Sequence, residues 1–411
     1  MTDSGASKSA ARVPVLTVLP ADPEQMAIGG IASFIRGFVK FAPDDFDLDF
    51  VGVSATRPLL RWQDIELEGR RVRILPITRG GGPTRSRMPI ALRFSLAVAA
   101  QRSRIGRLLA AQSWVIAFHR PGSDLWLPVR PGPRWRAVHL AVNDLATPGS
   151  ESRWRQLSSV LDRLERRSFS TMDRVYVVNR TVAAQYRARF PEAADRIQFV
   201  PNWADPTIFR QLPADVRGRV RAELDIDPAA PVVLFAGRLE GQKDPLLLAD
   251  AFAQVRRKLP SVVLVVAGDG ALAEPMRDLL IRRHRAAETT RFLGIVSRDR
   301  LAELMNAADV LAITSAFETG PTVGLEALAC GLPVVTTPVG EVSAIVAETG
   351  SGRATQGRSP EAVARALLEV LDPAQALRAT ALAAAAPYLA DRVLETIYDD
   401  NRRFAGRLRE T

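Results

Sequence analysis

Short apolar runs alternate with helical stretches along almost the whole chain, and this alternation limits the fold to the α/β class. Runs that stay apolar from end to end, such as Val232–Ala236 and Val310–Ile313, are typical of strands buried on both faces of a sheet. The helical stretches between them, such as Pro245–Arg257 and Arg298–Ala307, are the crossovers that parallel strands require. The sequence therefore predicts doubly wound parallel sheets.

One sheet of about twelve strands would be unusually large, so we expect two doubly wound, Rossmann-like domains, residues 13–205 and 206–385. The Pro-rich stretch Pro201–Pro213 is the expected boundary. We further expect a disordered N-terminus over residues 1–12 and a C-terminal helix over residues 386–411 that returns to the N-terminal domain. The other expected strands are Val13–Leu19, Leu48–Val53, Val72–Ile77, Trp114–Phe118, Ala137–Val142, Arg174–Val178, Gln198–Val200, Val262–Ala267, Thr290–Leu293 and Val334–Thr336, and the other expected helix is Ala271–Ala287.

The excess of positive over negative charge lies entirely in the first half of the chain. The 411 residues carry a net charge of +10, but residues 1–205 contain 30 basic and 19 acidic residues, whereas residues 206–411 contain 25 and 26. Between Gly69 and Asn143 there are 14 arginines and a single acid, Asp124, and all six tryptophans lie in the first half. We therefore expect the first half to meet an anionic partner.

Three interpretations of this basic stretch remain open. It can be the solvated surface of an Arg-rich protein, an anionic membrane interface, to which Arg and Trp together are suited, or a nucleic-acid surface. No recognised nucleic-acid-reading module accompanies the charge, so we expect no nucleic-acid partner. The segment Met88–Ala111 favours the membrane, because it predicts one apolar helical stripe surrounded by arginines. The stripe consists of Leu92, Leu96, Ile105, Leu108 and Leu109, with Arg93, Arg102, Arg104 and Arg107 around it.

Other features limit the compartment. The single cysteine, Cys330, excludes a disulfide framework and is expected to be a buried small residue. No apolar run approaches the roughly 20 residues of a membrane-spanning helix, and residues 1–12 lack the apolar segment of a secretory signal. We expect a cytoplasmic protein and leave peripheral attachment at the inner face of the plasma membrane open.

Charged residues follow two of the expected strands in the second half. After Val232–Ala236 come Gly237, Arg238 and, just before a helix, Lys243, which is one of only four lysines in the chain. Arg and Lys near a helix N-terminus form a site for a diphosphate. After Val310–Ile313 come Glu318, in a loop, and Glu326, inside an apolar helix. A carboxylate buried there needs partners, which sugar or ribose hydroxyls would supply.

These motifs resemble those of the retaining GT-B glycosyltransferases of family 4. The Glu318-x7-Glu326 pair runs into Ala-Leu-Ala-Cys-Gly-Leu-Pro-Val-Val, like the family signature, and Arg238 with Lys243 resembles its donor diphosphate site. Phe199–Asn202, with Asp205 and Phe209, resembles its interdomain linker, and Val266–Gly270 its next strand end. The resemblance implies a GT-B fold, in which two Rossmann-like domains face each other across a cleft.

The resemblance also implies roles for individual residues. Glu326 would bind the ribose, Glu318 a hydroxyl of the donor sugar, and Arg238 and Lys243 the diphosphate. Six further donor-contacting residues and one residue beside the donor sugar are implied as well. Amides of Thr319 and Gly320 would hold the sugar, the loop around Gly294 and Val296 would meet the nucleobase, Gly29 and Gly30 would approach the diphosphate, and His119 would lie beside the sugar.

Two departures from the family pattern concern the same loops. The family usually has Glu-Gly followed by an aromatic or aliphatic residue where this chain has Glu318-Thr319-Gly320, which leaves the donor sugar open. Lys243 is usually followed by Gly but here by Asp244.

No metal or other cofactor is expected. Asp45, Asp47 and Asp49 have the D-x-D spacing of metal-dependent transferases of another fold, but they alternate with apolar residues and are interpreted as the wet face of a strand. The three histidines offer no ligand spacing. They are His119, His139 and His284.

The sequence therefore predicts a retaining hexosyltransferase that moves a sugar from a nucleotide-diphosphate sugar, GDP-mannose or a UDP-sugar, to an acceptor hydroxyl. The expected acceptor is a saccharide or lipid-linked glycan in envelope or exopolysaccharide assembly. The alternatives are a sugar-nucleotide epimerase of the same architecture and a non-catalytic basic membrane adaptor. A nicotinamide dehydrogenase is disfavoured, since no G-x-G-x-x-G follows the first strand.

Overall fold

A computed structural model describes residues 12–26, 30–80, 90–110, 114–118, 136–140, 163, 166–167, 169–170, 172–318 and 320–410. The chain divides into two compact units. The first contains the described residues up to Val200 together with those from Leu394 onward, and the second is the continuous segment Pro201–Val393. This division lies five residues before the expected boundary, at the end of the last strand of the first unit. Of the expected disordered N-terminus, only Arg12 is among the described residues.

The second unit is built on a six-stranded parallel sheet with the order β11-β10-β9-β12-β13-β14. Its central strand β9 (Val232–Ala236) pairs with β10 (Val263–Ala267) on one side and with β12 (Val310–Ile313) on the other. The outer strands are β11 (Thr290–Gly294), β13 (Val334–Thr336) and β14 (Gly352–Ala354). The sequence predicted every strand here except β14, whose three residues begin with a glycine and contain an arginine.

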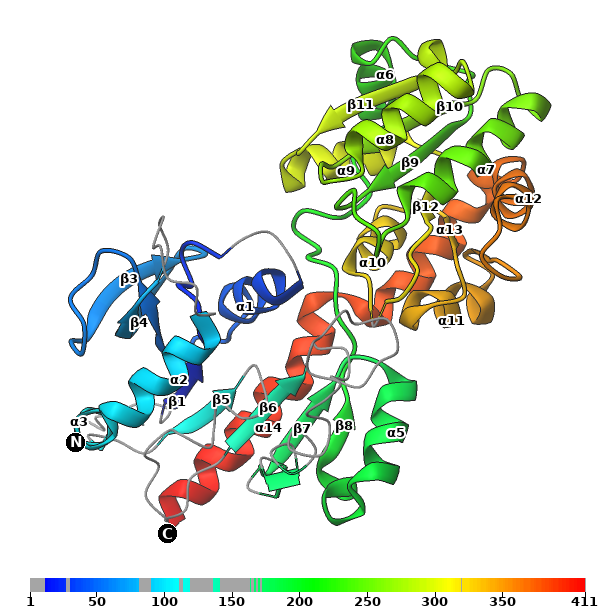
Figure 1. The fold of residues 1–411 in the computed structure, drawn as a ribbon. Coiled ribbons are helices and arrows are strands. Elements are labelled where there is room, and N and C mark those ends of the chain that lie inside the picture. Colours follow the sequence, from blue (N-terminus) through cyan, green and yellow to red (C-terminus); the bar gives the residue numbers. More distant parts are fainter. Residues whose placement is uncertain are drawn as a thin grey trace, which may run out of the picture. The chain divides into compact units, whose positions relative to one another are not determined.

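Helices cover both faces of this sheet (Figure 1). Val232 and Leu234 of β9 point into one buried cluster, whereas Val233 and Phe235 point into another, so the strand is buried on both sides as predicted. The first cluster includes α6 (Ala214–Glu223), α9 (Arg298–Ala307), α10 (Thr322–Ala329), α11 (Gly340–Thr349) and α13 (Ala374–Ala385). The second includes α7 (Pro245–Lys258), α8 (Ala273–Asp278) and α12 (Pro360–Leu371).

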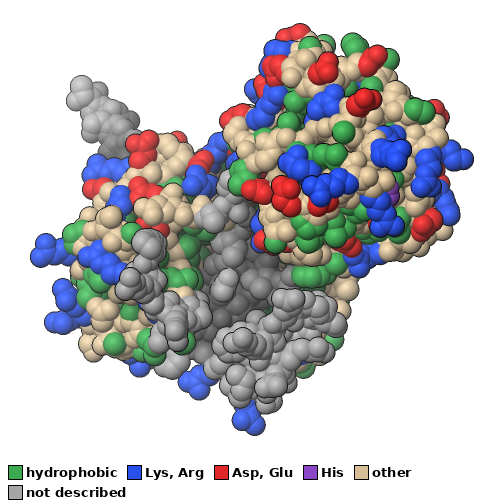
Figure 2. Space-filling view, turned by 45° about the horizontal axis from the view of Figure 1, so that its top comes forward, with side chains coloured by type: hydrophobic (Ala, Val, Ile, Leu, Met, Phe, Trp, Pro, Cys, Tyr) green, Lys and Arg blue, Asp and Glu red, His purple; other side chains and the backbone are tan. Residues whose placement is uncertain are grey.

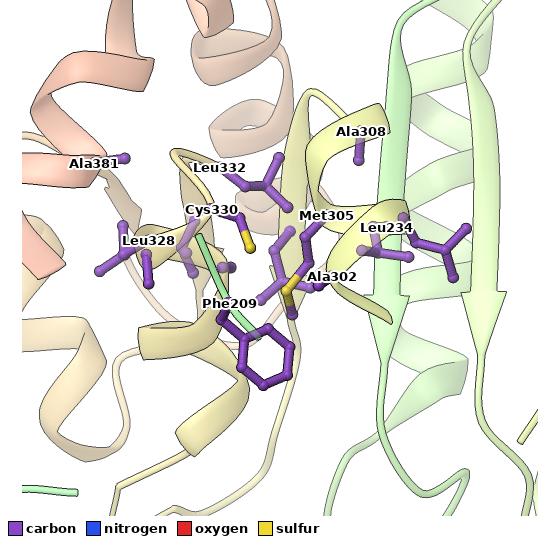
Figure 3. Close-up of a cluster of buried hydrophobic side chains, with 14 of the residues drawn as sticks. Phe209, Leu234, Ala302, Met305, Ala308, Leu328, Cys330, Leu332 and Ala381 are labelled. Carbon is purple, nitrogen blue, oxygen red and sulfur yellow. The ribbon is translucent and has the colours of Figure 1, made fainter. Parts of the chain in front are cut away.

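Cys330 lies inside the first cluster, near Met305 and Leu332 (Figure 3). The prediction that it is buried is confirmed, since its exposed fraction is 0%. Burial raises the pKa of the Cys330 thiol to about 12, so the thiol stays protonated and unreactive at neutral pH.

The first unit contains an eight-stranded sheet with the order β3-β4-β2-β1-β5-β6-β7-β8. Its strands are β1 (Val13–Val18), β2 (Phe46–Ser54), β3 (Gln63–Leu67), β4 (Arg70–Arg79), β5 (Val115–Phe118), β6 (Arg136–Leu140), β7 (Arg174–Val177) and β8 (Ile197–Phe199). All neighbours are parallel except β3, which pairs with β4 in the antiparallel sense. The sequence did not predict β3, because its residues alternate between polar and apolar instead of forming an apolar run.

The last helix of the chain belongs mainly to this first unit. Helix α14 (Ala390–Glu410) lies beside β6 and β7 in Figure 1. Tyr398 of α14 donates a hydrogen bond of 2.8 Å to the carbonyl of Phe38 in α1 (Gly30–Lys40), and its ring packs against Phe46 of β2. A second contact joins the helix to β7, where Asp400 accepts hydrogen bonds from Arg174 and Tyr176. Other helices in the described part of this unit include α2 (Ile90–Ala100), α3 (Arg102–Leu109) and α5 (Arg180–Arg189).

The prediction of a single apolar helical stripe over Met88–Ala111 was wrong. The segment forms two helices, α2 and α3, which meet at Gln101, so their apolar residues do not share one face. Ile105 and Leu109 are buried in the core, whereas Leu92 and Leu96 are 48% and 51% exposed. The buried anchors of α2 are instead Phe94 and Val98.

The prediction that the aspartates at the start of β2 form a solvent-exposed face was also wrong for one residue. Asp49 is buried, because its carboxylate pairs with the guanidinium of Arg73 on the neighbouring strand β4. Burial nevertheless raises the pKa of Asp49, and the hydrogen bonds from Arg73 oppose this rise. Asp47 is partly exposed and pairs with Arg12 at 2.7 Å.

The search for membrane-spanning segments was negative for the described part of the chain, in which no helix is both long and apolar enough.

Candidate functional site

The carboxyl edge of the second sheet brings the charged motifs together. The chain reverses its direction of progress across the sheet at β9, since β10 lies on one side of it and β12 on the other. Open parallel sheets bind ligands outside the carboxyl ends of strands at such a switch point. The loops that follow β9 and β12 carry Lys243 and Glu318, so these two residues lie at this position.

Three glycines let the loops behind β9, β10 and β11 pack closely. The amide of Gly237 donates to the carbonyl of Ala267 at 3.0 Å, and the amide of Gly268 donates to the carbonyl of Gly294 at 2.7 Å. At Gly268, where φ is +151°, a Cβ would lie only 1.9 Å from the carbonyl oxygen of Gly237. The backbone that leads into Arg238 is therefore held against its neighbour, with no room for a side chain between them.

The loop after β9 presents two cations. Arg238 is exposed and pairs with Glu240 at 2.7 Å, whereas Lys243 is 20% exposed in its side chain and contacts the carboxylate of Glu318. Helix α7 follows, with Asp244 as its N-cap, and the Asp244 carboxylate accepts a hydrogen bond from the Leu247 amide at 3.3 Å. Asp244 has a left-handed φ of +44°. This conformation explains why glycine suits the position and why a capping Asp can replace it.

The loop after β12 begins with two buried hydroxyl residues that organise the site. Thr314 Oγ1 donates to the carbonyls of Lys243 and Asp244, at 3.0 Å each. Ser315 Oγ donates to Glu318 Oε1 at 2.8 Å. Neighbouring hydroxyls therefore hold the backbone of the lysine loop and the carboxylate of Glu318.

The loop between β13 and α11 closes on Glu318 from another side. Thr337 Oγ1 donates to the carbonyl of Ser315 at 2.7 Å. At Gly340, where φ is +72°, a Cβ would lie 2.9 Å from the Cβ of Glu318. The carbonyl of Gly320 is fixed by Asn202 Nδ2 at 2.7 Å. Glu318 consequently has an exposed side-chain fraction of only 8%.

Glu326 is a second buried carboxyl, in the helix α10. Among the described residues, no group donates a hydrogen bond to its carboxylate. Burial raises the pKa of Glu326 to about 7, with Arg298 lowering it and Asp205 raising it further. Arg298 pairs with Asp205 at 3.7 Å and lies over the ring of Phe209, 5.3 Å from its centre. A mostly buried carboxyl that receives no hydrogen bond from a described residue is suited to accept hydrogen bonds from ligand hydroxyls.

The structure places most predicted site residues on one sheet edge. Arg238, Lys243, Glu318, Gly320, Gly294 and Val296 follow or end strands of the second unit, and Glu326 follows in α10. Gly294, with a φ of +65°, ends β11, and Ile295 beside it is 74% exposed. Gly30 begins α1 in the first unit. Gly29, His119 and Thr319 lie outside the described residues.

Sequence reasoning missed the residues that position this set. They are Thr314, Ser315, Thr337 and Arg298. The signal for the first two was available, since hydroxyl residues directly after a buried strand lie where functional groups are expected. Arg298 looked like an ordinary surface arginine at the start of a helix.

A metal-ligand arrangement is not found in the described part of the chain, where no three His, Cys, Asp or Glu side chains are grouped suitably. The expectation that the protein works without a metal stays a prediction. The described chemistry is that of two buried carboxyls and two cations, which can together bind a ligand that carries hydroxyls and a diphosphate.

Comparison with known proteins gives matches of two kinds. Residues 216–385 match the family described as glycosyl transferases group 1. The chain is 34% identical over 198 residues to a D-inositol 3-phosphate glycosyltransferase of Segniliparus rotundus, covering 47% of this chain and 43% of that protein. A protein of the same description from Nocardia farcinica is 32% identical over 228 residues, covering 54% and 50%. The chain thus spans about half the length of the curated relatives it matches.

Solved structures share the fold over almost the whole chain. Sucrose-phosphate synthase from Thermosynechococcus elongatus superposes with a TM-score of 0.77 at 19% identity, covering 95% of this chain and 99% of that one. WaaG, a glycosyltransferase involved in lipopolysaccharide biosynthesis, gives 0.71 at 18% identity, covering 94% and 99%. Anabaena Alr3699/HepE in complex with UDP-glucose gives 0.66 at 19% identity, covering 97% and 100%. The expected GT-B fold is confirmed.

Proposed function

We propose that the protein is a glycosyltransferase that uses a nucleotide-diphosphate sugar, because residues 216–385 match the family described as glycosyl transferases group 1. The observation that carries the proposal is the meeting of Lys243 and Glu318 at the switch point of the second sheet. Both residues lie within the segment that matches this family.

Each charged residue has a place in donor binding. Arg238 and Lys243 bind the diphosphate, because guanidinium and ammonium groups form charge-assisted hydrogen bonds to phosphate oxygens. Glu318 accepts a hydrogen bond from a hydroxyl of the donor sugar. Glu326 accepts hydrogen bonds from the ribose hydroxyls, which supply the donors that the described part of the protein does not. The two cations also stabilise the negative charge that develops on the leaving nucleoside diphosphate.

The proposed reaction retains the configuration of the sugar. The bond between the anomeric carbon and the diphosphate oxygen breaks, and the acceptor oxygen bonds to the same face of the sugar. The departing diphosphate takes the proton of the acceptor hydroxyl, so no protein carboxylate has to act as nucleophile or base. A nuclear magnetic resonance spectrum of the product, read at the anomeric proton, distinguishes retention from inversion.

The donor can be tested without knowing the acceptor. A ligand that binds only the folded state raises the unfolding temperature in proportion to the logarithm of its concentration over its dissociation constant. We expect UDP or GDP, and the matching UDP-sugar or GDP-mannose, to stabilise the protein. HepE is described as binding UDP-glucose, which makes UDP-glucose the first donor to try. Absence of stabilisation by every nucleotide would rule out the proposed function.

The acceptor is proposed to carry a sugar or polyol hydroxyl. The relatives are described as D-inositol 3-phosphate glycosyltransferases, so D-inositol 3-phosphate is one acceptor to test. A lipid-linked glycan of envelope or exopolysaccharide assembly, at the cytoplasmic face of the membrane, is the other and is supported by the basic first half of the chain.

The surface of α2 and α3 supports a membrane contact. Leu92 and Leu96 are exposed on α2, and α3 carries the exposed residues Arg102, Arg104 and Arg107, which have no ion pair with another described residue. Apolar side chains beside unpaired arginines suit an anionic headgroup region. Over the second unit, by contrast, basic and acidic side chains intermix on the face shown in Figure 2.

We expect the protein to sediment with anionic liposomes at low salt. Replacing Leu92 and Leu96 with Ser should weaken this binding, whereas Ile295→Ser, which removes an even more exposed apolar side chain from the second unit, should not. Binding to neutral vesicles only, or to none, would count against membrane attachment but not against transferase activity.

A sugar-nucleotide epimerase of the same architecture remains the second candidate. It would convert the donor without an acceptor. Incubation of the protein with UDP-glucose alone separates the two, because an epimerase produces a second UDP-sugar whereas a transferase leaves the donor sugar unchanged or hydrolyses it.

A further inference from the structure

Lys243 and Ser315 share one carboxylate oxygen. Lys243 Nζ contacts Oε1 of Glu318, and Ser315 Oγ donates to the same oxygen at 2.8 Å. The lysine comes from the loop after β9, and the serine and glutamate come from the loop after β12. The side chains of Lys243 and Glu318 are only 20% and 8% exposed. Without ligand, the cation proposed for the diphosphate and the carboxylate proposed for the sugar are therefore each other's partners.

A ligand that binds Lys243 removes the cationic partner of the Glu318 carboxylate. A carboxylate that is mostly buried is stable as an anion only when a cation or several hydrogen-bond donors satisfy it. If a diphosphate takes the lysine, Glu318 retains only Ser315 among the partners just described. A second donor must then come from the ligand.

We propose that the Lys243–Glu318 pair makes the site distinguish a nucleotide sugar from the bare nucleoside diphosphate and thereby favours release of the spent nucleotide. This inference rests on the proposed function. With a nucleotide sugar bound, a sugar hydroxyl donates to Glu318 in place of Lys243, and the lysine is free for the diphosphate. Once the sugar has been transferred, Glu318 loses that hydroxyl and recaptures Lys243, which weakens the hold on the nucleoside diphosphate.

The surrounding hydrogen bonds confine this exchange to side chains. Thr314 ties the backbone carbonyls of Lys243 and Asp244 to the loop after β12. Thr337 ties the carbonyl of Ser315 to the end of β13. Because both loops are anchored, the lysine can turn between the carboxylate and a phosphate without a movement of the backbone. Ser315 is a positioning residue in this scheme, since it acts on the ligand only through Glu318.

The test compares a nucleoside diphosphate with its sugar derivative. Isothermal titration calorimetry with UDP and UDP-glucose, and with GDP and GDP-mannose, gives both dissociation constants for the pair that binds. In Glu318→Gln the lysine loses its anionic partner, so we expect the bare diphosphate to bind about tenfold more tightly than to the wild type. The nucleotide sugar should gain less or bind more weakly, because its hydroxyl loses a charged acceptor.

A second variant should act in the opposite direction. In Ser315→Ala the carboxylate depends more strongly on Lys243, so the bare diphosphate should bind more weakly, while the nucleotide sugar should lose less. Glu240→Gln is the matched control, because it removes a carboxylate from the same loop that is 40% exposed and paired with Arg238. It should leave the ratio of the two dissociation constants unchanged.

Two results would overturn the inference. The first is that the wild type binds a nucleotide but Glu318→Gln does not bind the bare diphosphate more tightly than the wild type does. Thermal unfolding must show in this case that the variant is folded. The other is an equal loss of both ligands in Ser315→Ala, which is what a purely structural role would give. Failure of the wild type to bind any of the four nucleotides would overturn the proposed function and this inference together.

Discussion

Arg298 and Asp205 form an ion pair beside Glu326, with 3.7 Å between Nη1 and Oδ2. The two charges act on the buried Glu326 carboxyl in opposite directions, since the arginine lowers its pKa and the aspartate raises it. Burial is the larger influence and raises the pKa to about 7. The residue proposed to hold the ribose therefore titrates within the physiological range.

Glu326→Gln should stabilise the free protein at high pH. Because the pKa in the folded state is about 7 and the usual value is 4.5, folding favours the protonated carboxyl. Its contribution is fully present below pH 4.5 and is lost as the pH rises through 7, at a cost of about 3 kcal/mol. Thermal unfolding at a series of pH values should show the variant more stable than the wild type at pH 8 and equal to it at pH 4.5. A difference that does not change with pH would contradict this.

Nucleotide affinity should follow the same titration. The ionised carboxyl is the better acceptor for ribose hydroxyls, so affinity should rise between pH 6 and pH 8. Asp205→Asn removes a negative charge near Glu326 and should move the midpoint of this rise to lower pH. Titration calorimetry with the nucleotide at several pH values measures the midpoint, and an unshifted midpoint would exclude the role given to Asp205.

Arg238→Met should weaken nucleoside diphosphate binding by about tenfold or more, since a charge-assisted contact to phosphate is lost. The stability of the free protein should change by less than about 1 kcal/mol, because the pair with Glu240 is exposed. Arg353→Met is the control, as it breaks a similarly exposed pair with Glu369 at 3.0 Å. Equal binding by the two variants would remove Arg238 from the site.

Gly268→Ala should damage both stability and nucleotide binding. The added Cβ would lie 1.9 Å from the Gly237 carbonyl, so the backbone before Arg238 must move. We expect a cost of about 2 kcal/mol or more. Gly241→Ala, in the loop after β9 but facing open space, should leave both properties near the wild-type values. Differential scanning calorimetry with and without nucleotide measures both effects, and similar behaviour of the two variants would contradict the close packing of these loops.

Asp400→Asn should destabilise the first unit by about 3 kcal/mol. Asp400 is 1% exposed and accepts hydrogen bonds from Arg174 at 3.0 Å and Tyr176 at 2.8 Å, so loss of its charge deprives the partly buried guanidinium of Arg174 of this anionic partner. Its neighbour Asp399 is 53% exposed and pairs only with Arg402 among the described residues, so Asp399→Asn should cost far less. Urea unfolding followed by tryptophan fluorescence reports mainly on this unit, because five of the six tryptophans precede Pro201 in the sequence.

The elements that could be predicted are those with a continuous local signal. The strands β9, β12 and β13 coincide with apolar runs, because burial on both faces removes polar residues from the run. Strand β3 was not predicted because it is half-exposed and has no continuous apolar run. The expected helix Ala271–Ala287 is interrupted by a π-helical turn at Leu279–Arg283. No local pattern marks that interruption.

Contacts between residues that are distant in the sequence could not be predicted. Lys243 and Glu318 were both candidates, but their contact depends on β9 lying next to β12, and strand order is not encoded in either loop. The same limit hid Arg298, whose effect on Glu326 exists only because α9 packs near α10. Sequence reasoning therefore identified charged groups near strand ends and could not say which of them would pair.

The return of α14 to the first unit has a consequence for biosynthesis. The second unit is one continuous segment, so all of it has been synthesised before Leu394 appears. The first unit contains residues that precede the second unit but needs Tyr398 and Asp400, which are synthesised after it. Its sheet must therefore wait, with part of its apolar surface uncovered, while the second unit folds. Nascent chains of this protein should accordingly depend on chaperones at the first unit until α14 has left the ribosome.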